Sequence, residues 1–218
     1  GSVECTSSDA RLTSVGTFVP DFSGITKPQK AVLTLAMGEL HNSYAFWLYP
    51  QTDVEITENG IKTADDELIF TDSVEKAKVL IASGKKAMVI TDGSNAIDNA
   101  YCADFWNYHM FRVISESMNK PVAPGTMGLL IDKNDKLLSA FPCEKFTTPQ
   151  WYEAVTHSKA DILDDTPDVT PIVQVVDNTE RCHRLGMLYK KNGILHTVGN
   201  NEIQEQNARQ EAVQKRYT

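Results

Sequence analysis

The segment Thr91-Asp92-Gly93-Ser94-Asn95 is the nearest approach in this sequence to a catalytic nucleophile. It directly follows an apolar, strand-like run that ends at Ile90. The nucleophile elbow of a hydrolase needs Gly-x-Ser-x-Gly or Gly-x-Cys-x-Gly, because its sharp turn brings two backbone segments close together. Here the only glycine stands outside the required positions, and Asp-Gly-Ser is typical of a turn. We therefore expect a turn around Ser94 and predict no catalytic residue.

Cysteines and histidines are dispersed, which disfavours both a metal site and a catalytic dyad. The cysteines form no Cys-x-x-Cys pair and stand at Cys5, Cys102, Cys143 and Cys182. We expect buried small hydrophobic residues, with two disulfides as the alternative. Cys182 next to His183 is not interpreted as a dyad, because neighbours in sequence rarely face each other. The histidines show no metal-ligand spacing and no phosphate-binding glycine loop is present, so we predict no metal and no cofactor.

Aromatic residues are the remaining candidates for binding. One cluster holds Trp106 and Tyr108, and a second holds Trp151 and Tyr152. Each tryptophan lies beside the apolar stripe of its predicted helix rather than on it. Exposed tryptophans stack on flat apolar faces such as sugar rings, and they equally fill interfaces between domains. These four residues are the predicted binding residues, with an interface or core role as the alternative.

The secondary structure predicted around these residues changes along the chain from strands alone to alternating strands and helices. Up to about residue 50, β-branched and aromatic residues alternate over 14–19, 31–37 and 44–49, and Pro20, Pro28 and Pro50 interrupt the pattern. Three strands are marginal by themselves. Residues 1–50 are therefore predicted to be a β-rich lead-in that belongs to a preceding sandwich or to an added sheet.

From residue 68 onward, strands and helices alternate. Apolar strands are predicted at 68–70, 86–90 and 127–131, with helices between them. The first helix starts at a capping box formed by Asp72 and Glu75 and ends at Gly84. The second is predicted over 104–119. This rhythm predicts an α/β fold with a doubly wound, mostly parallel sheet.

The rest of the chain adds a helix, a hairpin and a final helix to this sheet. Thr148 and Pro149 begin a helix that runs to Val155, and a central strand is predicted over 172–176. Asn192-Gly193 is a strong hairpin signal between the apolar runs 185–189 and 194–198. The polar helix predicted over 205–217 has no cap, which indicates a truncation. Residues 51–218 are thus predicted to form one α/β domain.

Composition narrows the range of partners. The chain has 218 residues, with 21 Lys and Arg against 29 Asp and Glu, a net charge of −8. A nucleic-acid binder needs a basic face, so we predict no nucleic-acid partner. No apolar run approaches the roughly 18 residues of a membrane-spanning helix, so no membrane span is expected.

An ordered set of motifs resembles the C-terminal part of family 2 glycoside hydrolases of the Bacteroidetes type. The resemblance covers roughly 25–218. It begins with Asn42-Ser43-Tyr44-Ala45-Phe46-Trp47-Leu48-Tyr49-Pro50 and continues through Asp104-Phe105-Trp106-Asn107-Tyr108. It ends with Pro124-Gly125-Thr126-Met127-Gly128, Phe141-Pro142, Gln150-Trp151, and Pro171-Ile172-Val173-Gln174-Val175-Val176-Asp177-Asn178 before Glu180-Arg181.

This resemblance implies an accessory domain without catalytic residues. The family's catalytic barrel is absent from the chain, and the corresponding C-terminal module is similar to class I glutamine amidotransferases and flavodoxin-like folds. The implied work is packing on the catalytic barrel or on another subunit, or shaping substrate access. The implied location is periplasmic or extracellular. The family has Trp-Trp where this chain has Trp151-Tyr152.

Two alternatives from other classes stay open. The chain is a carbohydrate-binding module if at least two of the four aromatic residues are exposed and coplanar on one surface, where they would contact an oligosaccharide. It is an independent amidotransferase-like or hydrolase-like enzyme if Ser94 or a cysteine stands at a strand-to-helix turn with a histidine in hydrogen-bond reach.

Overall fold

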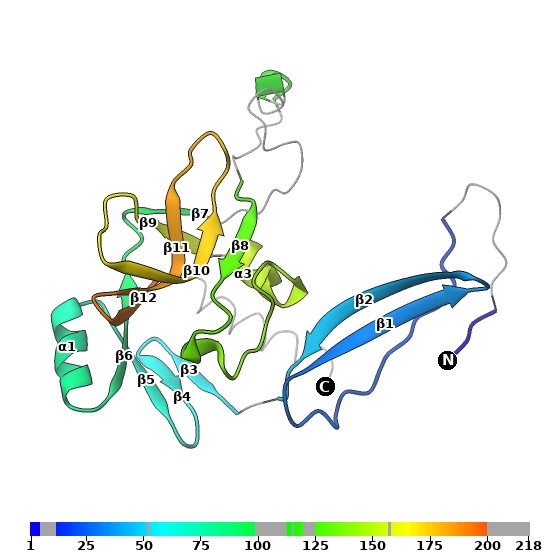
Figure 1. Cartoon of the computed structure of the whole chain (residues 1–218), viewed down its shortest axis with the longest axis horizontal. Coiled ribbons are helices and arrows are strands. Elements are labelled where there is room, and N and C mark those ends of the chain that lie inside the picture. The colour runs from blue at the N-terminus through cyan, green and yellow to red at the C-terminus, as the bar shows by residue number, and fades with distance from the viewer. Residues whose placement is uncertain are drawn as a thin grey trace.

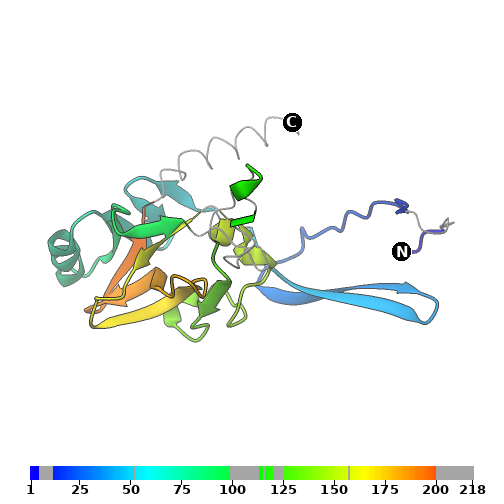
Figure 2. The same cartoon turned by 90° about the horizontal axis from the view of Figure 1, so that it is seen from above.

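The computed structural model describes residues 1–4, 12–51, 53–98, 113–114, 116–119, 125–156 and 158–199. Within these ranges the chain is mostly β-structure: a two-stranded hairpin and a ten-stranded mixed sheet. The hairpin projects away from the globular part that the large sheet forms, as two perpendicular views show (Figures 1 and 2). No helix among the described residues is long and apolar enough to cross a membrane.

The projecting hairpin pairs β1 (Gln29–Met37) with β2 (Leu40–Leu48) in antiparallel register. The two predicted strands at 31–37 and 44–49 are therefore confirmed in outline. Gly38 closes the turn with a φ of 58°, a backbone conformation that glycine adopts without strain. The third predicted strand, over 14–19, is wrong, because these residues pair with no strand in the structure. We call residues 12–48 the arm.

The large sheet places its last strand in the chain, β12, between β6 and β11. Its order is β3-β4-β5-β6-β12-β11-β10-β8, and β9 pairs with β11 and β7. The bounds are β3 (Glu55–Thr57), β4 (Gly60–Lys62), β5 (Glu67–Thr71), β6 (Lys86–Thr91), β7 (Ala96–Asp98), β8 (Gly128–Ile131), β9 (Lys159–Ile162), β10 (Val169–Val176), β11 (Arg184–Lys191) and β12 (Ile194–Val198).

The first crossover follows the sequence prediction closely. Helix α1 (Val74–Ala82) connects β5 to β6, which lie parallel to each other. Ser73 caps the helix by accepting a hydrogen bond from the backbone N–H of Lys76, so the cap stands one residue later than the predicted Asp72. Gly84 ends the helix with a φ of 84°, as predicted.

The predicted doubly wound, amidotransferase-like or flavodoxin-like sheet is wrong. Among the described residues, the parallel pairs are those of β6 with β5 and with β12. The run 127–131, predicted as the third parallel strand, forms β8 at the far edge of the sheet, antiparallel to β10. A short apolar run fits either strand direction equally well, because burial does not depend on direction. The direction of β8 is therefore decided by the strand with which it pairs.

The hairpin predicted at Asn192-Gly193 is confirmed. Strands β11 and β12 pair in antiparallel register across it, and Asn192 and Gly193 have φ values of 50° and 78°. Two positive φ values are typical of a type I′ turn, which matches the twist of the strands. The predicted strand 172–176 lies within β10.

Short helices cover one part of the sheet. Residues Lys136–Leu138 form the 3₁₀ turn η2, and Pro149–Trp151 form η3, which continues into α3 (Tyr152–Thr156). The predicted start at Thr148 is confirmed, although the Thr148 side chain makes no capping hydrogen bond. Most of the predicted helix 104–119 and all of the helix 205–217 lie outside the described residues.

The larger core lies under β8, β10 and β11. It contains Trp151 and the fully buried Val173, Val175 and Leu185. A smaller core packs Ala77 of α1 on β6 and β12. The larger core thus packs against the β8, β10 and β11 side of the sheet, and helix α1 covers the side formed by β5, β6 and β12.

Candidate functional site

Of the four aromatic residues predicted to bind a ligand, the structure describes Trp151 and Tyr152. Trp106 and Tyr108 lie outside the described residues. Trp151 is 8% exposed and belongs to the core, whereas the next residue, Tyr152, is 61% exposed. Trp151 and Tyr152 therefore do not share one exposed surface, because the 3₁₀ turn η3 that leads into α3 places the two residues in different environments.

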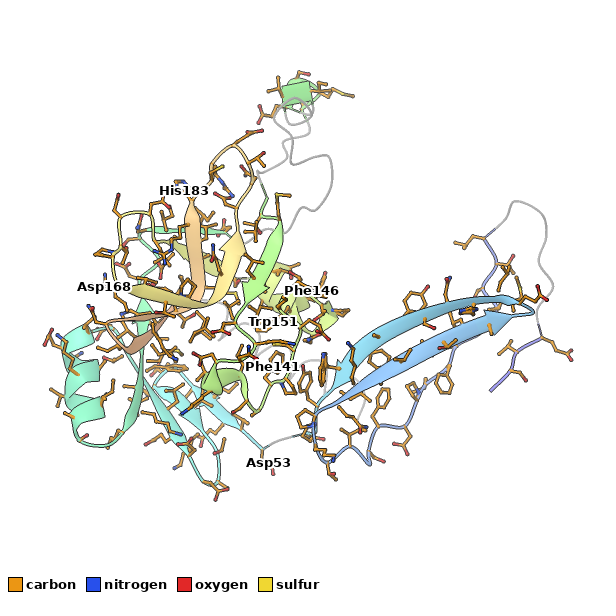
Figure 3. The ribbon with its side chains drawn as sticks, viewed as in Figure 1. Asp53, Phe141, Phe146, Trp151, Asp168 and His183 are labelled. Atoms are coloured by element: carbon orange, nitrogen blue, oxygen red, sulfur yellow. The ribbon has the colours of Figure 1, made fainter. Side chains whose placement is uncertain are left out.

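Trp151 instead belongs to the contact between the globular part and the base of the arm. Its ring meets the edge of Phe141 at a centroid distance of 5.2 Å, and Phe141 stacks on Tyr49 at 4.5 Å. The Tyr49 hydroxyl donates to the backbone carbonyl of Pro142. Figure 3 shows Phe141 and Trp151 on the side of the globular part that faces the arm. The interface alternative for Trp151 is the one that this packing favours.

The segment around Ser94 is a turn, as predicted. The backbone N–H of Ser94 donates to the Asp92 carboxylate, and the chain continues into strand β7 rather than into a helix. A nucleophile elbow requires a strand-to-helix turn. Ser94 therefore lacks the backbone setting of a nucleophile.

The described cysteines are free thiols. Cys143 is buried and Cys182 is exposed, with its Sγ at 3.1 Å from the Thr179 carbonyl oxygen. His183 Nδ1 lies 2.6 Å from the Asp164 carboxylate, so it is held away from Cys182 by another partner. Cys5 and Cys102 lie outside the described residues.

The motif Asp177-Asn178 with Arg181 forms a turn that is anchored by the buried side chains of Asp177 and Asn178. Arg181 donates to the Asp177 carboxylate through Nε at 3.0 Å and Nη2 at 2.6 Å. The Asn178 amide donates to the carbonyl of Gly125 and accepts from two backbone N–H groups. These residues carried part of the sequence resemblance, and in this fold they fix the connection between β10 and β11.

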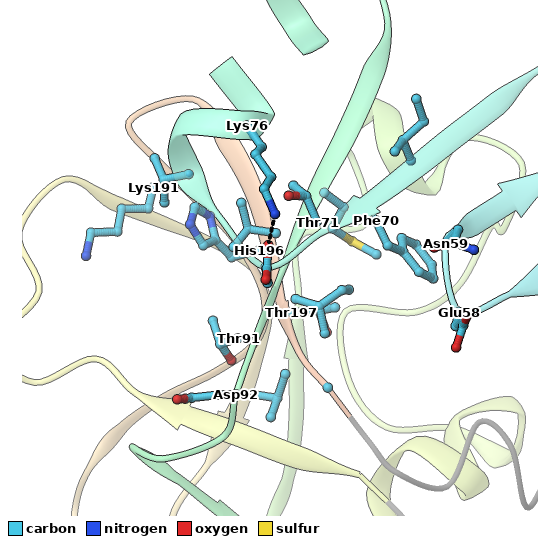
Figure 4. A pocket seen from close by; sticks show the side chains of 18 of the residues that line it. Glu58, Asn59, Phe70, Thr71, Lys76, Thr91, Asp92, Lys191, His196 and Thr197 are labelled. Atoms are coloured by element: carbon cyan, nitrogen blue, oxygen red, sulfur yellow. Dashed lines mark hydrogen bonds and ion pairs between the residues drawn. The ribbon is translucent and has the colours of Figure 1, made fainter. Parts of the chain in front are cut away.

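A groove opens at the carboxyl ends of β5, β6 and β12, beside the N-terminus of α1 (Figure 4). Its volume is about 2040 Å³, well above the roughly 300–1,000 Å³ of common small-molecule pockets. Ligands in open sheets with parallel strands bind at this end of the strands. The polar residues that line the groove include Thr71, Asp72, Thr91, Asp92, Tyr189 and His196.

A buried polar network forms one wall of this groove. Asp161 is 6% exposed, and its carboxylate accepts from the Tyr189 hydroxyl at 2.9 Å and from Thr91 Oγ1 at 3.0 Å. Burial raises the pKa of Asp161, while the bonds from Tyr189 and Thr91 lower it. The three residues come from β9, β11 and β6, which are distant in sequence. The network fixes these strands relative to one another.

His196 continues this network into the groove. Its ring stacks on Tyr189 at a centroid distance of 5.3 Å, and the residue is 4% exposed. Nδ1 lies 2.9 Å from the carbonyl oxygen of Ile194. A carbonyl oxygen can only accept, so Nδ1 carries the proton and Nε2 holds a lone pair. Burial lowers the pKa of His196, which favours this neutral form.

Charges of both signs surround the groove. Lys76 Nζ donates a hydrogen bond of 2.9 Å to Asp72, and this bond, followed by the positive charge of Lys76, lowers the pKa of Asp72. The hydrogen bonds from Ser94 lower the pKa of Asp92. Lys191 also lines the groove. The carboxylates, ammonium group and hydroxyls of this lining can both accept and donate hydrogen bonds. No group of three His, Cys, Asp or Glu side chains suited to a metal ion occurs in the described ranges.

Sequence reasoning missed Asp161, Tyr189 and His196. A signal for His196 was present, because it occupies an inward position between Ile194 and Val198 in an alternating strand, where an apolar residue is usual. Asp161 and Tyr189 gave no comparable signal. Their partners come from other strands.

In the comparisons with known proteins, two family models match different parts of the chain. A family model described as "Domain of unknown function (DUF8487)" matches residues 68–195, more than half of the chain, and the chain belongs to this family. A second model, "Domain of unknown function (DUF8488)", matches residues 1–50. No curated protein matches the chain. The first match covers most of the groove, and the second covers the arm.

Proposed function

We propose that this DUF8487 member is a non-catalytic accessory domain of a glycan-processing enzyme and that its arm docks on an apolar sheet elsewhere in that enzyme. The observation that carries the proposal is the exposed apolar face of the arm. The glycoside hydrolase resemblance described above supplies the class of enzyme. The occupant is a β-sheet of the enzyme's β-rich region, on the same chain or on a neighbouring subunit.

The two faces of the arm differ strongly. Residues paired across an antiparallel ladder share a face, so the pairs Leu33–Tyr44, Leu35–Asn42 and Met37–Leu40 lie on one side. The opposite face carries pairs such as Thr34–Ser43 and Ala36–His41. An amphipathic sheet packs its apolar face on a second sheet about 10 Å away.

The apolar face is uncovered over most of its length. Leu35 is 56% exposed and Met37 is 69% exposed, and Leu33, Leu40 and Tyr44 are also exposed. Phe22 contacts Phe46 near the base of the arm. Covering a half-exposed aliphatic side chain contributes roughly 1 kcal/mol. A two-stranded hairpin is marginal in water, so this contribution decides whether the arm is ordered.

Two buried indole donors lie at the base of the arm. Trp47 Nε1 and Trp151 Nε1 are buried and have no hydrogen-bond partner. A buried donor without an acceptor costs about 1–3 kcal/mol. Trp47 pairs with Lys30, so it lies on the face opposite Leu33, Leu35 and Met37. These two donors therefore belong to the packing at the base of the arm, and the proposal rests on the exposed apolar face alone.

Photo-crosslinking within the full-length gene product tests this proposal. A photoreactive phenylalanine replaces Leu35 on the apolar face, and the matched control replaces Thr34 on the opposite face. We expect Leu35 crosslinks to peptides from a β-rich region outside this chain, with few crosslinks from Thr34. Equal yields from the two positions would contradict the docking face. Hydrolysis of aryl glycosides by the isolated chain would contradict the non-catalytic assignment.

A further inference from the structure

We propose that the groove beside α1 binds a neutral, hydroxyl-rich ligand of the saccharide class, with His196 Nε2 accepting a hydrogen bond from one ligand hydroxyl. The inference rests on the proposed function for the choice of saccharides as ligand class. It concerns the globular part and not the arm.

The first argument is the state of His196. A histidine that is 4% exposed would normally have both ring nitrogens bonded. Nδ1 bonds to Ile194, but no described residue bonds to Nε2. His196 is one of the residues that line the groove, and Figure 4 shows its ring among the lining side chains. Nε2, an acceptor in this tautomer, is therefore the ring nitrogen that remains for a ligand.

The second argument is that the acceptor is held rigidly. The ring of His196 lies nearly parallel to that of Tyr189, with 12° between their planes. Tyr189 is in turn anchored on Asp161, which Thr91 also contacts. A preorganised acceptor loses little conformational entropy when it binds a ligand. The network thus acts as a support for Nε2.

The third argument is the balance of charge, which distinguishes ligand classes. Asp72 pairs with Lys76, and Glu75 pairs with Lys78. The other charged residues of the lining balance as well, because Glu58 and Asp92 are negative and Lys159 and Lys191 are positive. A phosphate would meet the carboxylates of this lining, which disfavours it. A neutral polyol both donates to carboxylates and accepts from ammonium groups.

The fourth argument is the shape of the site and its apolar walls. Phe70, Met88 and Val198 also line the groove, and the CH faces of sugar rings pack on such side chains. The volume of about 2040 Å³ exceeds the needs of a single ring. The groove therefore suits an oligosaccharide better than a monosaccharide.

Binding is measured by calorimetry on the full chain with neutral tetrasaccharides: cello-, malto-, galacto- and xylotetraose. Inorganic phosphate and a glucuronate oligosaccharide are the anionic probes. We expect at least one neutral tetrasaccharide to bind with a Kd of about 1 mM or tighter. The proposal is overturned if none binds, or if an anionic probe binds more tightly than every neutral one.

Two variants locate the binding site. His196→Phe keeps a ring against Tyr189 but removes Nε2, and we expect it to weaken binding about tenfold, as loss of one hydrogen bond predicts. Asp92→Ala changes an exposed groove residue and should weaken binding even if His196→Phe folds poorly. The matched control, His183→Gln, lies outside the groove and should bind as the parent chain does. Unchanged affinity in Asp92→Ala and in folded His196→Phe would overturn the proposal.

Nitrogen-15 NMR of the histidine side chains separates a ligand contact from a purely structural role. In the free chain, Nε2 of His196 should show the shift of an unprotonated nitrogen. Saturation with the saccharide should move that resonance and leave Nδ1 almost unchanged. A His196 Nε2 shift that stays constant while calorimetry shows binding would place the ligand elsewhere. Arm crosslinking and groove binding have independent readouts, so failure of one does not imply failure of the other.

Discussion

Replacing Tyr189 with phenylalanine tests the buried network directly. The substitution removes one hydroxyl from a side chain that is 4% exposed and leaves the ring in place. That hydroxyl lies 2.9 Å from the Asp161 carboxylate. A hydrogen bond to a charged group contributes about 1.5–3 kcal/mol. Thr91 still bonds to Asp161 in the variant, so we expect the free energy of unfolding to fall by about 2 kcal/mol.

The loss should depend on pH in a defined direction. Burial raises the pKa of Asp161 above its ordinary value of 3.8, so the carboxyl group binds its proton more tightly in the folded chain than in the unfolded chain. Its contribution to stability is therefore greatest below the unfolded pKa and declines as pH rises through the folded pKa. Tyr189→Phe removes a bond that stabilises the ionised form, so the folded pKa rises further. The stability difference between variant and parent should grow with pH.

Urea denaturation followed by tryptophan fluorescence measures both effects, at about pH 5 and about pH 8. Trp151 lies in the core and reports unfolding of the globular part. Tyr152→Phe is the matched control, because Tyr152 is 61% exposed and its change should stay within about 0.5 kcal/mol. A Tyr189→Phe loss as small as that of the control, or one that shrinks as pH rises, would refute the network as described.

Two further predictions concern the core and the ion pair of a buried carboxylate. Leu185→Ala should lower the free energy of unfolding by about 2–5 kcal/mol, because Leu185 is fully buried. Leu35→Ala on the exposed arm should change the free energy of unfolding by less than about 0.5 kcal/mol. Equal losses for the two variants in urea denaturation would contradict the core described above. Arg181→Ala should cost about 3 kcal/mol by leaving the buried Asp177 carboxylate with backbone donors alone. Lys78→Ala breaks the exposed pair with Glu75 and should cost at most about 1 kcal/mol by the same measurement. A smaller loss in Arg181→Ala than in Lys78→Ala would show that the buried Asp177 carboxylate does not depend on Arg181.

The residues of the buried network beside the groove could not be found from the sequence, because they come together only when the strands pair. Thr91, Asp161, Tyr189 and His196 lie on four strands, and none of them stands in a motif. Their contacts exist because β12 pairs with β6 on one side and with β11 on the other, which also brings β9 close. For Trp151 the sequence suggested a functional role that the packing does not favour. Its residue type suggested a ligand contact, but packing against Phe141 placed it in the core at the base of the arm.

Local features of this protein were determined by the sequence alone. The Asn192-Gly193 turn, the end of α1 at Gly84 and the start of η3 after Thr148 follow from backbone preferences that act within a few residues. The direction of β8, the order of the strands and the groove were decided by tertiary structure. An apolar run is stabilised by any neighbouring strand that buries it, so its own sequence does not select the partner. Strand pairing therefore depends on all the strands that can occupy each edge of the sheet.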